Sequence, residues 1–115
     1  MHTLWFTLRF VDSIQNEEII NNLFKSEFLM ATEKMSSNKV FSFGRDHGYH
    51  GRLLSHGIVA EQSLHIKDNT LTGYCFTPQD GNALLSSVAG TIQYYDKDNW
   101  KEKMKLFNRY IFKNI

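Results

Sequence analysis

Residues 44–56 bring together side chains that could do acid–base chemistry, spaced by three glycines. They are two arginines, three histidines, an aspartate and a tyrosine, namely Arg45, Asp46, His47, Tyr49, His50, Arg52 and His56. Histidine titrates near neutral pH, so it can act as a general acid, a general base or a metal ligand. The glycine density predicts an irregular loop, in which histidines three positions apart have no fixed mutual geometry.

One hypothesis for this loop is a small metal-independent ribonuclease or phosphoryl-transfer enzyme. One imidazole would remove the 2′-hydroxyl proton of RNA, and an arginine would stabilise the negative charge that develops on the phosphate. The residues that would carry this chemistry are His47, His50, Arg45 and Arg52. We prefer the alternative, a polar surface loop that is rich in histidine, and therefore assign no catalytic residue.

The remaining patterns predict neither a metal site nor a cofactor. His47, His50 and His56 could supply three zinc ligands, but the chain lacks a His-Glu-x-x-His motif and has a single cysteine. Residues 48–51 (Gly-Tyr-His-Gly) lack the Gly-Lys-Ser/Thr ending of a phosphate-binding loop. Cys75 lies between two aromatic residues in an expected strand, where a cysteine behaves as a small apolar residue with a raised pKa.

Length and composition predict one domain that covers residues 1–115, with 42% hydrophobic and 22% charged residues. A single cysteine excludes an internal disulfide, which fits a reducing cytoplasm. The longest uncharged apolar runs are too short to cross a membrane, and the N-terminal residues do not resemble a signal peptide. A pI near 7.9 argues against a nucleic-acid-binding protein. We expect a cytoplasmic protein.

The apolar periodicity predicts an α+β fold, with a mostly antiparallel sheet and two amphipathic helices in the order β-α-β-β-β-β-α. Residues 83–89 fit either a short helix capped by Asn82 or the start of a strand, and we favour the strand. The expected elements are a strand over 3–11, a helix over 13–36, a strand over 40–43, a hairpin of strands over 52–67 and 70–77, a loop over 77–82, a strand over 84–95 and a helix from the cap at 96–98 to about 113.

Charge is uneven along the chain, although the net charge is only +1. Residues 1–38 sum to −2, residues 39–96 to −1 and residues 97–115 to +4. The two expected helices therefore carry opposite charge, and each could steer a charged partner.

With no convincing catalytic set, the size and charge pattern favour a protein-binding inhibitor. The most concrete form is a bacterial immunity protein that binds and neutralises a toxin domain, for example a nuclease delivered in contact-dependent growth inhibition. An acidic helix would enter the basic cleft of such a toxin. The expected contact residues are Glu17, Glu18, Glu27, Glu33, Asp46 and Tyr49.

Three alternatives stay open at this point. The first is the enzyme described above. The second is a phage-encoded inhibitor of a host defence complex, which would use the same physics on another target. The third concerns assembly, because the expected strand over residues 3–11 could pair with a second copy of the chain.

Overall fold

Strand β5 (Thr70–Thr77) is the centre of a mixed five-stranded sheet in a computed structural model of the protein. The description covers the backbone of residues 1–12 and 16–115; the side chains of residues 16, 17, 19 and 80–82 lie outside it. The other elements are β1 (His2–Arg9), α1 (Asn16–Phe24), β2 (Leu29–Thr32), α2 (Ser37–His47), β3 (Gly57–Ala60), the 3₁₀ turn η1 (Glu61–Ser63), β4 (His65–Lys67), α3 (Gln79–Tyr95), α4 (Trp100–Met104) and the 3₁₀ segment η2 (Lys105–Tyr110).

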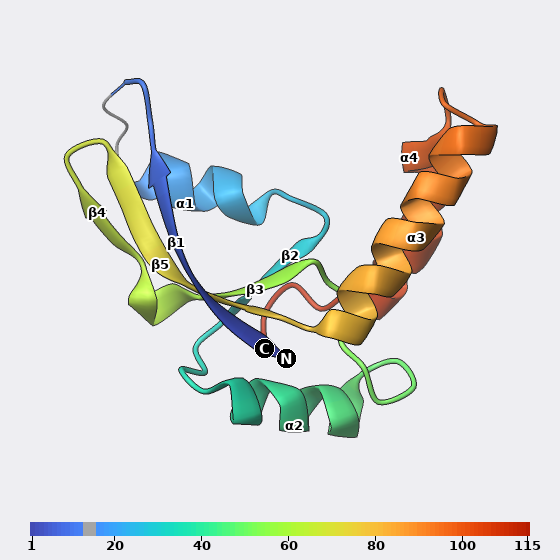
Figure 1. The fold of residues 1–115 in the computed structure, drawn as a ribbon, viewed down its shortest axis with the longest axis horizontal. Helices are drawn as coiled ribbons and strands as arrows, with labels where there is room; N and C mark the ends of the chain where they lie inside the picture. Colours follow the sequence, from blue (N-terminus) through green and yellow to red (C-terminus); the bar gives the residue numbers. More distant parts are fainter. Residues whose placement is uncertain (13–15) are drawn as a thin grey trace.

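The sheet has the order β1-β5-β3-β2, with β4 also paired to β5 (Figure 1). The β1–β5, β3–β5 and β4–β5 pairs are antiparallel, whereas β2 and β3 are parallel. The α+β class and the mostly antiparallel sheet are confirmed. The element order is not, because the described residues contain four α-helices where we expected two.

The strand predicted over residues 3–11 is correct, as are the turn and the second strand of the hairpin predicted over 52–67 and 70–77. The first strand of that hairpin is wrong in extent, because residues 57–67 are divided into β3, the turn η1 and β4. The strand predicted over residues 3–11 is β1, which pairs with β5 along its whole length. The predicted hairpin turn joins β4 to β5, with Asp68 at a positive φ of 55°. An aspartate tolerates this left-handed conformation better than most residues.

The helix predicted over residues 13–36 is wrong in its second half. Helix α1 ends at Phe24, and Leu29–Thr32 form the strand β2; residues 13–15 lie outside the description. Strand β2 is almost fully buried, and a continuous apolar run is typical of a parallel strand that is covered on both faces. The apolar residues between 28 and 31 fit a helical stripe and a buried strand equally well, and burial in the sheet selects the strand.

The predicted strand over residues 40–43 is instead part of α2, and the predicted glycine loop begins only after His47. Two neighbouring parallel strands need a crossover connection, which is usually a helix, and α2 is that connection between β2 and β3. Val40 and Phe43 pack into the core from one face of α2, while Phe41 stays exposed.

The loop predicted over residues 77–82 and the strand predicted over 84–95 are both replaced by the 17-residue helix α3. The inner face of α3 packs against the segment that follows it. That segment is shorter than the predicted C-terminal helix, because α4 ends at Met104 and tightens into η2. We call residues 79–110, from α3 to η2, the arm.

In the view of Figure 1 the arm projects to the right of the sheet, whereas α2 lies below the sheet. The principal extents of 42 × 35 × 19 Å show that the molecule is flat. The radius of gyration of 15.0 Å exceeds the value of about 13 Å typical of a compact domain of about 100 residues. A flat molecule exposes more apolar surface than a rounded one of equal mass.

The core is divided into two clusters. One lies between the sheet and α2, and its buried residues are Met30, Val40, Leu53, Ile58, Ala60 and Phe76. The other lies at the arm, and its buried residues are Leu54, Leu85, Met104 and Ile111. The adjacent Leu53 and Leu54 contribute to different clusters, so the segment before β3 connects them.

Candidate functional site

The glycine-rich segment after α2 forms a tight turn between Tyr49 and Arg52. The N–H of Arg52 donates to the carbonyl of Tyr49 at 3.0 Å, and the two residues form an isolated β-bridge. His50 and Gly51, at the central positions, have φ values of 48° and 73°. Positive φ at both central positions is the signature of a type I′ turn.

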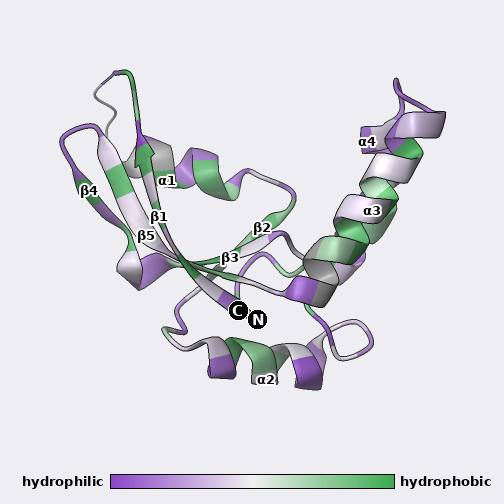
Figure 2. Ribbon diagram, viewed as in Figure 1, coloured by the Kyte–Doolittle hydropathy of each residue, from purple (hydrophilic) through white to green (hydrophobic). Residues whose placement is uncertain are grey.

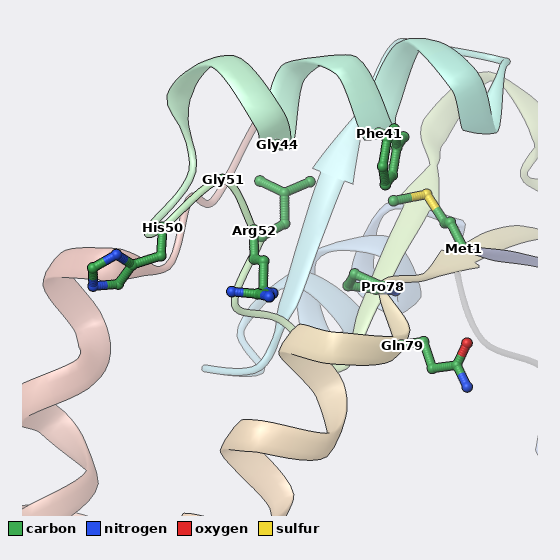
Figure 3. A pocket seen from close by; sticks show the side chains of 9 residues that line it. Met1, Phe41, Gly44, His50, Gly51, Arg52, Pro78 and Gln79 are labelled. Atoms are coloured by element: carbon green, nitrogen blue, oxygen red, sulfur yellow. The ribbon is translucent and has the colours of Figure 1, made fainter.

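This turn borders a pocket of about 330 Å³ between α2 and the start of α3 (Figure 3). Phe41 and Met1 form its apolar side, and Arg52 lies on the opposite side, near Pro78 (Figure 3). His50 lies at the rim, with its ring turned away from Arg52 in this view. The pocket is small, and Arg52 is the one lysine or arginine among its described lining residues.

Two of the four residues in the ribonuclease hypothesis are not part of this pocket. The His47 ring stacks on Phe43, with ring centroids 4.6 Å apart, and Arg45 is bound to its neighbour Asp46 through two hydrogen bonds of 2.8 and 3.2 Å. The structure therefore places His50 and Arg52 at the pocket and leaves the other two on α2.

His56 makes a contact that the sequence did not predict. Its Nε2 lies 3.3 Å from Oγ of Ser86 on α3, and its ring stacks on Phe28 with centroids 4.7 Å apart. Burial lowers the pKa of His56 below its ordinary value of 6.5. A serine beside a neutral histidine has the residue types of a nucleophile and its base, but the separation is long for such a pair. The contact fixes the arm to the segment before β3.

Metal binding finds no support in the described part of the chain. No group of three histidine, cysteine, aspartate or glutamate side chains comes close enough there to hold a metal ion. Cys75 is half-buried on β5, and burial raises the pKa of its thiol, as the sequence predicted. A thiol of this kind is a weak nucleophile at neutral pH.

The four glutamates expected to bind a partner lie on three separate segments. Glu17 and Glu18 belong to α1, although the side chain of Glu17 lies outside the description, whereas Glu27 and Glu33 belong to the connections before and after β2. Glu27 lies in a depression also lined by Lys101 and Lys105, and Glu33 lies in one lined by Lys34 and Lys39. The single acidic helix on which we based this expectation does not exist.

Asp46 and Tyr49 are both exposed, as a contact residue requires. The hydrogen bonds from Arg45 lower the pKa of the Asp46 carboxyl. The Tyr49 ring lies between His50 and Tyr110, with centroid distances of 4.4 and 4.2 Å. Tyr49 therefore connects the turn to η2 of the arm.

The most unusual surface is the outer side of α3, which the sequence analysis missed because it assigned a strand there. Every described side chain of α3 is uncharged, and most of the helix is white to green in Figure 2. Tyr94 and Tyr95 are 84% and 82% exposed at its end, and Leu106 on η2 is 75% exposed. The signal available in the sequence was the uncharged run from 81 to 95 with a 3.6-residue apolar period at 85, 88, 89 and 92.

Two cationic side chains of the arm lie over aromatic rings. Lys101 lies over the Trp100 ring at 5.7 Å, and Arg109 lies over the Tyr110 ring at 4.6 Å. The segment 97–115 carries six lysine or arginine residues and two acidic ones, so its net charge is +4. Within the arm itself (79–110), five lysine or arginine residues stand against four acidic ones, so its net charge is +1, and Lys103 and Lys105 are ion-paired with Asp96 and Glu102.

Comparison with known proteins adds no relative. A scan against protein-family models finds no match, and a search of curated proteins finds none either. None of the helices in the described residues is both long enough and apolar enough to span a membrane.

Proposed function

We propose that this protein acts by binding another protein, as an inhibitor or immunity protein does, and that the arm is its contact surface. The observation that carries the proposal is the exposed end of α3, where Tyr94 and Tyr95 lie on a helix with no described charged side chain; Leu106, on η2 of the same arm, is also exposed. A bacterial toxin neutralised by direct binding remains the most concrete partner class within this proposal.

The composition of residues 83–95 of α3, which lack any charged side chain, matches the centre of a protein interface. Interface centres are poor in charged residues and rich in tyrosine and tryptophan, because these rings bury a large area while losing little conformational entropy. A helix face that only met water would have no reason to lack lysine and glutamate over four turns. The rings of Tyr94 and Tyr95 contact each other edge to face, with centroids 5.3 Å apart, and together form an aromatic surface at the end of α3.

The charge around the arm specifies the partner further. Lys101 and Arg109 lie over the half-buried rings of Trp100 and Tyr110 on the arm. A partner that covered the tyrosines and also reached Lys101 or Arg109 would need acidic groups at these cations, beside an apolar site for the rings. This reverses the polarity expected from the sequence, in which the glutamates of the protein would enter a basic cleft.

The proposal is tested by capture of partners from the source cells with three purified baits: the wild-type protein, the double variant Tyr94→Ala/Tyr95→Ala and the control Phe41→Ala. All three substitutions remove an exposed ring, and Phe41 lies on α2, far from the end of α3 that carries Tyr94 and Tyr95 (Figure 1). Proteins retained by each bait are quantified by mass spectrometry, and the retained protein is then titrated against each bait by calorimetry.

We expect one protein to be retained by the wild type and by Phe41→Ala and lost with the double variant. Loss of two central interface rings typically weakens binding by about 30-fold or more, which corresponds to about 2 kcal/mol. Retention of the same protein by all three baits would show that the arm is not the contact surface. Failure to retain any specific protein would contradict the proposed function itself.

A further inference from the structure

Strand β1 forms an open edge of the sheet along its whole length. The N–H of Phe10 donates to the carbonyl of Asn69 at 2.8 Å, which extends the β1–β5 pairing beyond Arg9. Hydrogen bonds alternate along an antiparallel pair, so the even-numbered residues of β1 bond to β5. The odd-numbered residues direct their N–H and C=O groups to the open side, and no other described strand pairs with them; these residues are Thr3, Trp5, Thr7 and Arg9.

The two outer strands of the sheet differ in whether other residues cover their outer edge. At the β2 edge, the C-terminal residues cover the strand: the N–H of Ala31 donates to the carbonyl of Lys113 at 2.9 Å, and the N–H of Ile115 donates to the carbonyl of Ala31 at 3.1 Å. Strand β1 has no such cover among the described residues and contains no proline, lysine or bulge. Open edges normally carry one of these protections, because an unprotected edge pairs with another strand.

The side chains of β1 are also exposed on both faces of the sheet. Trp5 is 58% exposed on one face, where its ring makes an edge contact with Tyr74 at a centroid distance of 4.7 Å. Leu4 and Leu8 are 48% and 42% exposed on the other face. An added strand would therefore gain backbone hydrogen bonds together with apolar contacts on each face.

We propose that β1 pairs with β1 of a second copy of this chain, antiparallel and around a two-fold axis at Phe6. This register places Leu4 opposite Leu8 of the second copy, because the two leucines are equally distant from Phe6 in the sequence. It also joins the open N–H and C=O groups of Trp5 to those of Thr7 of the second copy. The two sheets become one continuous sheet through the dimer.

The pattern of β1 is self-complementary in this register, which is why we select a second copy as the occupant. An isologous interface requires each residue to fit its symmetry mate, and like charges opposite each other would oppose pairing. The single charged residue of β1, Arg9, falls opposite Thr3 of the second copy. Trp5 packs against Tyr74 of β5 within one copy, and in the dimer it would also lie opposite Thr7 of the second copy on the same face of the sheet.

The first test is the mass of the full chain in solution, measured by light scattering and by sedimentation. We expect about twice the chain mass of 13.4 kDa at protein concentrations up to about 100 μM, where a complex of micromolar Kd is saturated. A protein with the mass of one chain over this range would overturn the proposal.

The register is tested with two matched double variants, Leu4→Lys/Leu8→Lys and Leu4→Lys/Leu8→Glu. Both remove the same half-exposed leucines, but the first places like charges opposite each other across the two-fold axis and the second places opposite charges there. We expect the first variant to be monomeric and the second to be dimeric, with at least a tenfold difference in the dimer dissociation constant. Equal behaviour of the two variants would overturn the proposed pairing.

A variant that removes one backbone N–H tests the β1–β1 pairing without changing the leucines. Thr7→Pro removes an N–H that points to the open side, so pairing with β5 is preserved while the dimer bond is lost. Thr7→Val keeps that N–H and the shape of the side chain, and it should remain dimeric. Circular dichroism and the thermal midpoint show that both variants are folded, and a dimeric Thr7→Pro would contradict the role of the β1 edge.

Discussion

Gly48 lies where α2 ends and the backbone comes closest to the following turn. Its N–H donates to the carbonyl of Gly44 at 2.8 Å. A Cβ atom at this position would lie 2.3 Å from the carbonyl oxygen of Arg52 and 2.5 Å from that of Gly44. Both neighbours are backbone atoms, which cannot rotate away as a side chain can. The glycine is therefore required by close packing of the chain against itself.

Gly48→Ala should lower the free energy of unfolding by about 3 kcal/mol, because the added methyl group forces the Tyr49–Arg52 turn away from α2. Gly51→Ala is the control: Gly51 has a φ of 73° but its Cβ would meet nothing closer than 3.8 Å, so only the left-handed conformation is strained, at about 1 kcal/mol. Urea denaturation of both variants measures the difference, and equal losses would refute the close-packing explanation.

His56 should make folding stability depend on pH. Burial against Phe28 places its pKa in the folded protein below the ordinary value of 6.5, so the unfolded chain takes up a proton first as the pH falls. Its contribution to stability is complete above pH 6.5 and is lost as the pH falls towards the folded pKa. The effect is small because the ring is only partly buried.

The urea midpoint of the wild type should therefore decrease between about pH 7.5 and about pH 5.5, and His56→Phe should decrease less over the same range because it has no proton to bind. The phenylalanine ring can keep the stacking on Phe28. Titration of the His56 ring by nuclear magnetic resonance gives the folded pKa directly. A value at or above 6.5 would refute the burial argument.

At the scale of the elements, apolar periodicity identified segments more reliably than it identified their type. It found β1 and the β4–β5 hairpin, where alternation and a turn residue agree. It failed over 29–32 and 84–95, where the tertiary environment decides: β2 is buried between β3 and the C-terminal residues, while α3 packs by one face. The β-branched and aromatic residues between 91 and 95 favour a strand locally, and packing against α4 overrides that preference.

The same distinction applies to the candidate site: residue types could be read from the sequence, whereas contacts between distant residues could not. The sequence identified His50 and Arg52 because their residue types signal chemistry, and both border the pocket beside α2. It could not identify the contact of His56 with Ser86, which are thirty positions apart. It also missed the arm, since an uncharged face becomes visible only when the segment is known to be a helix.

Two helical glycines allow a direct test of α3. A Cβ on Gly90 would meet nothing within 4 Å, so Gly90→Ala should raise the free energy of unfolding by about 0.5–1 kcal/mol by restricting the unfolded chain. Gly44→Ala on α2 is the matched control, because its Cβ would lie 3.0 Å from Cγ of Leu53 and the packing cost offsets the gain. Thermal and urea denaturation compare them, and a destabilised Gly90→Ala would contradict a helix over 79–95.

At the scale of the whole molecule, two separate core clusters suggest two levels of local stability. The cluster under α2 includes residues of β2, β3 and β5, whereas the cluster at the arm depends on Leu85, Met104 and Ile111. Regions with fewer buried contacts open more often, and binding surfaces are commonly drawn from such regions. A flat molecule with an extended arm should therefore open at the arm before the sheet.

Hydrogen exchange of Leu85→Ala and Ile58→Ala should separate these two levels. Both side chains are completely buried, so each truncation should cost about 2–5 kcal/mol where its cluster contributes to opening. Leu85→Ala should speed exchange mainly in α3 and α4, because the sheet retains its own cluster. Ile58→Ala should speed exchange in β3, β5 and the arm alike, because the arm is anchored on the sheet through the segment from Leu53 to His56. If Leu85→Ala instead accelerated exchange in β5 as much as in α3, the two clusters would form one cooperative unit, and the arm could not adjust to a partner independently of the sheet.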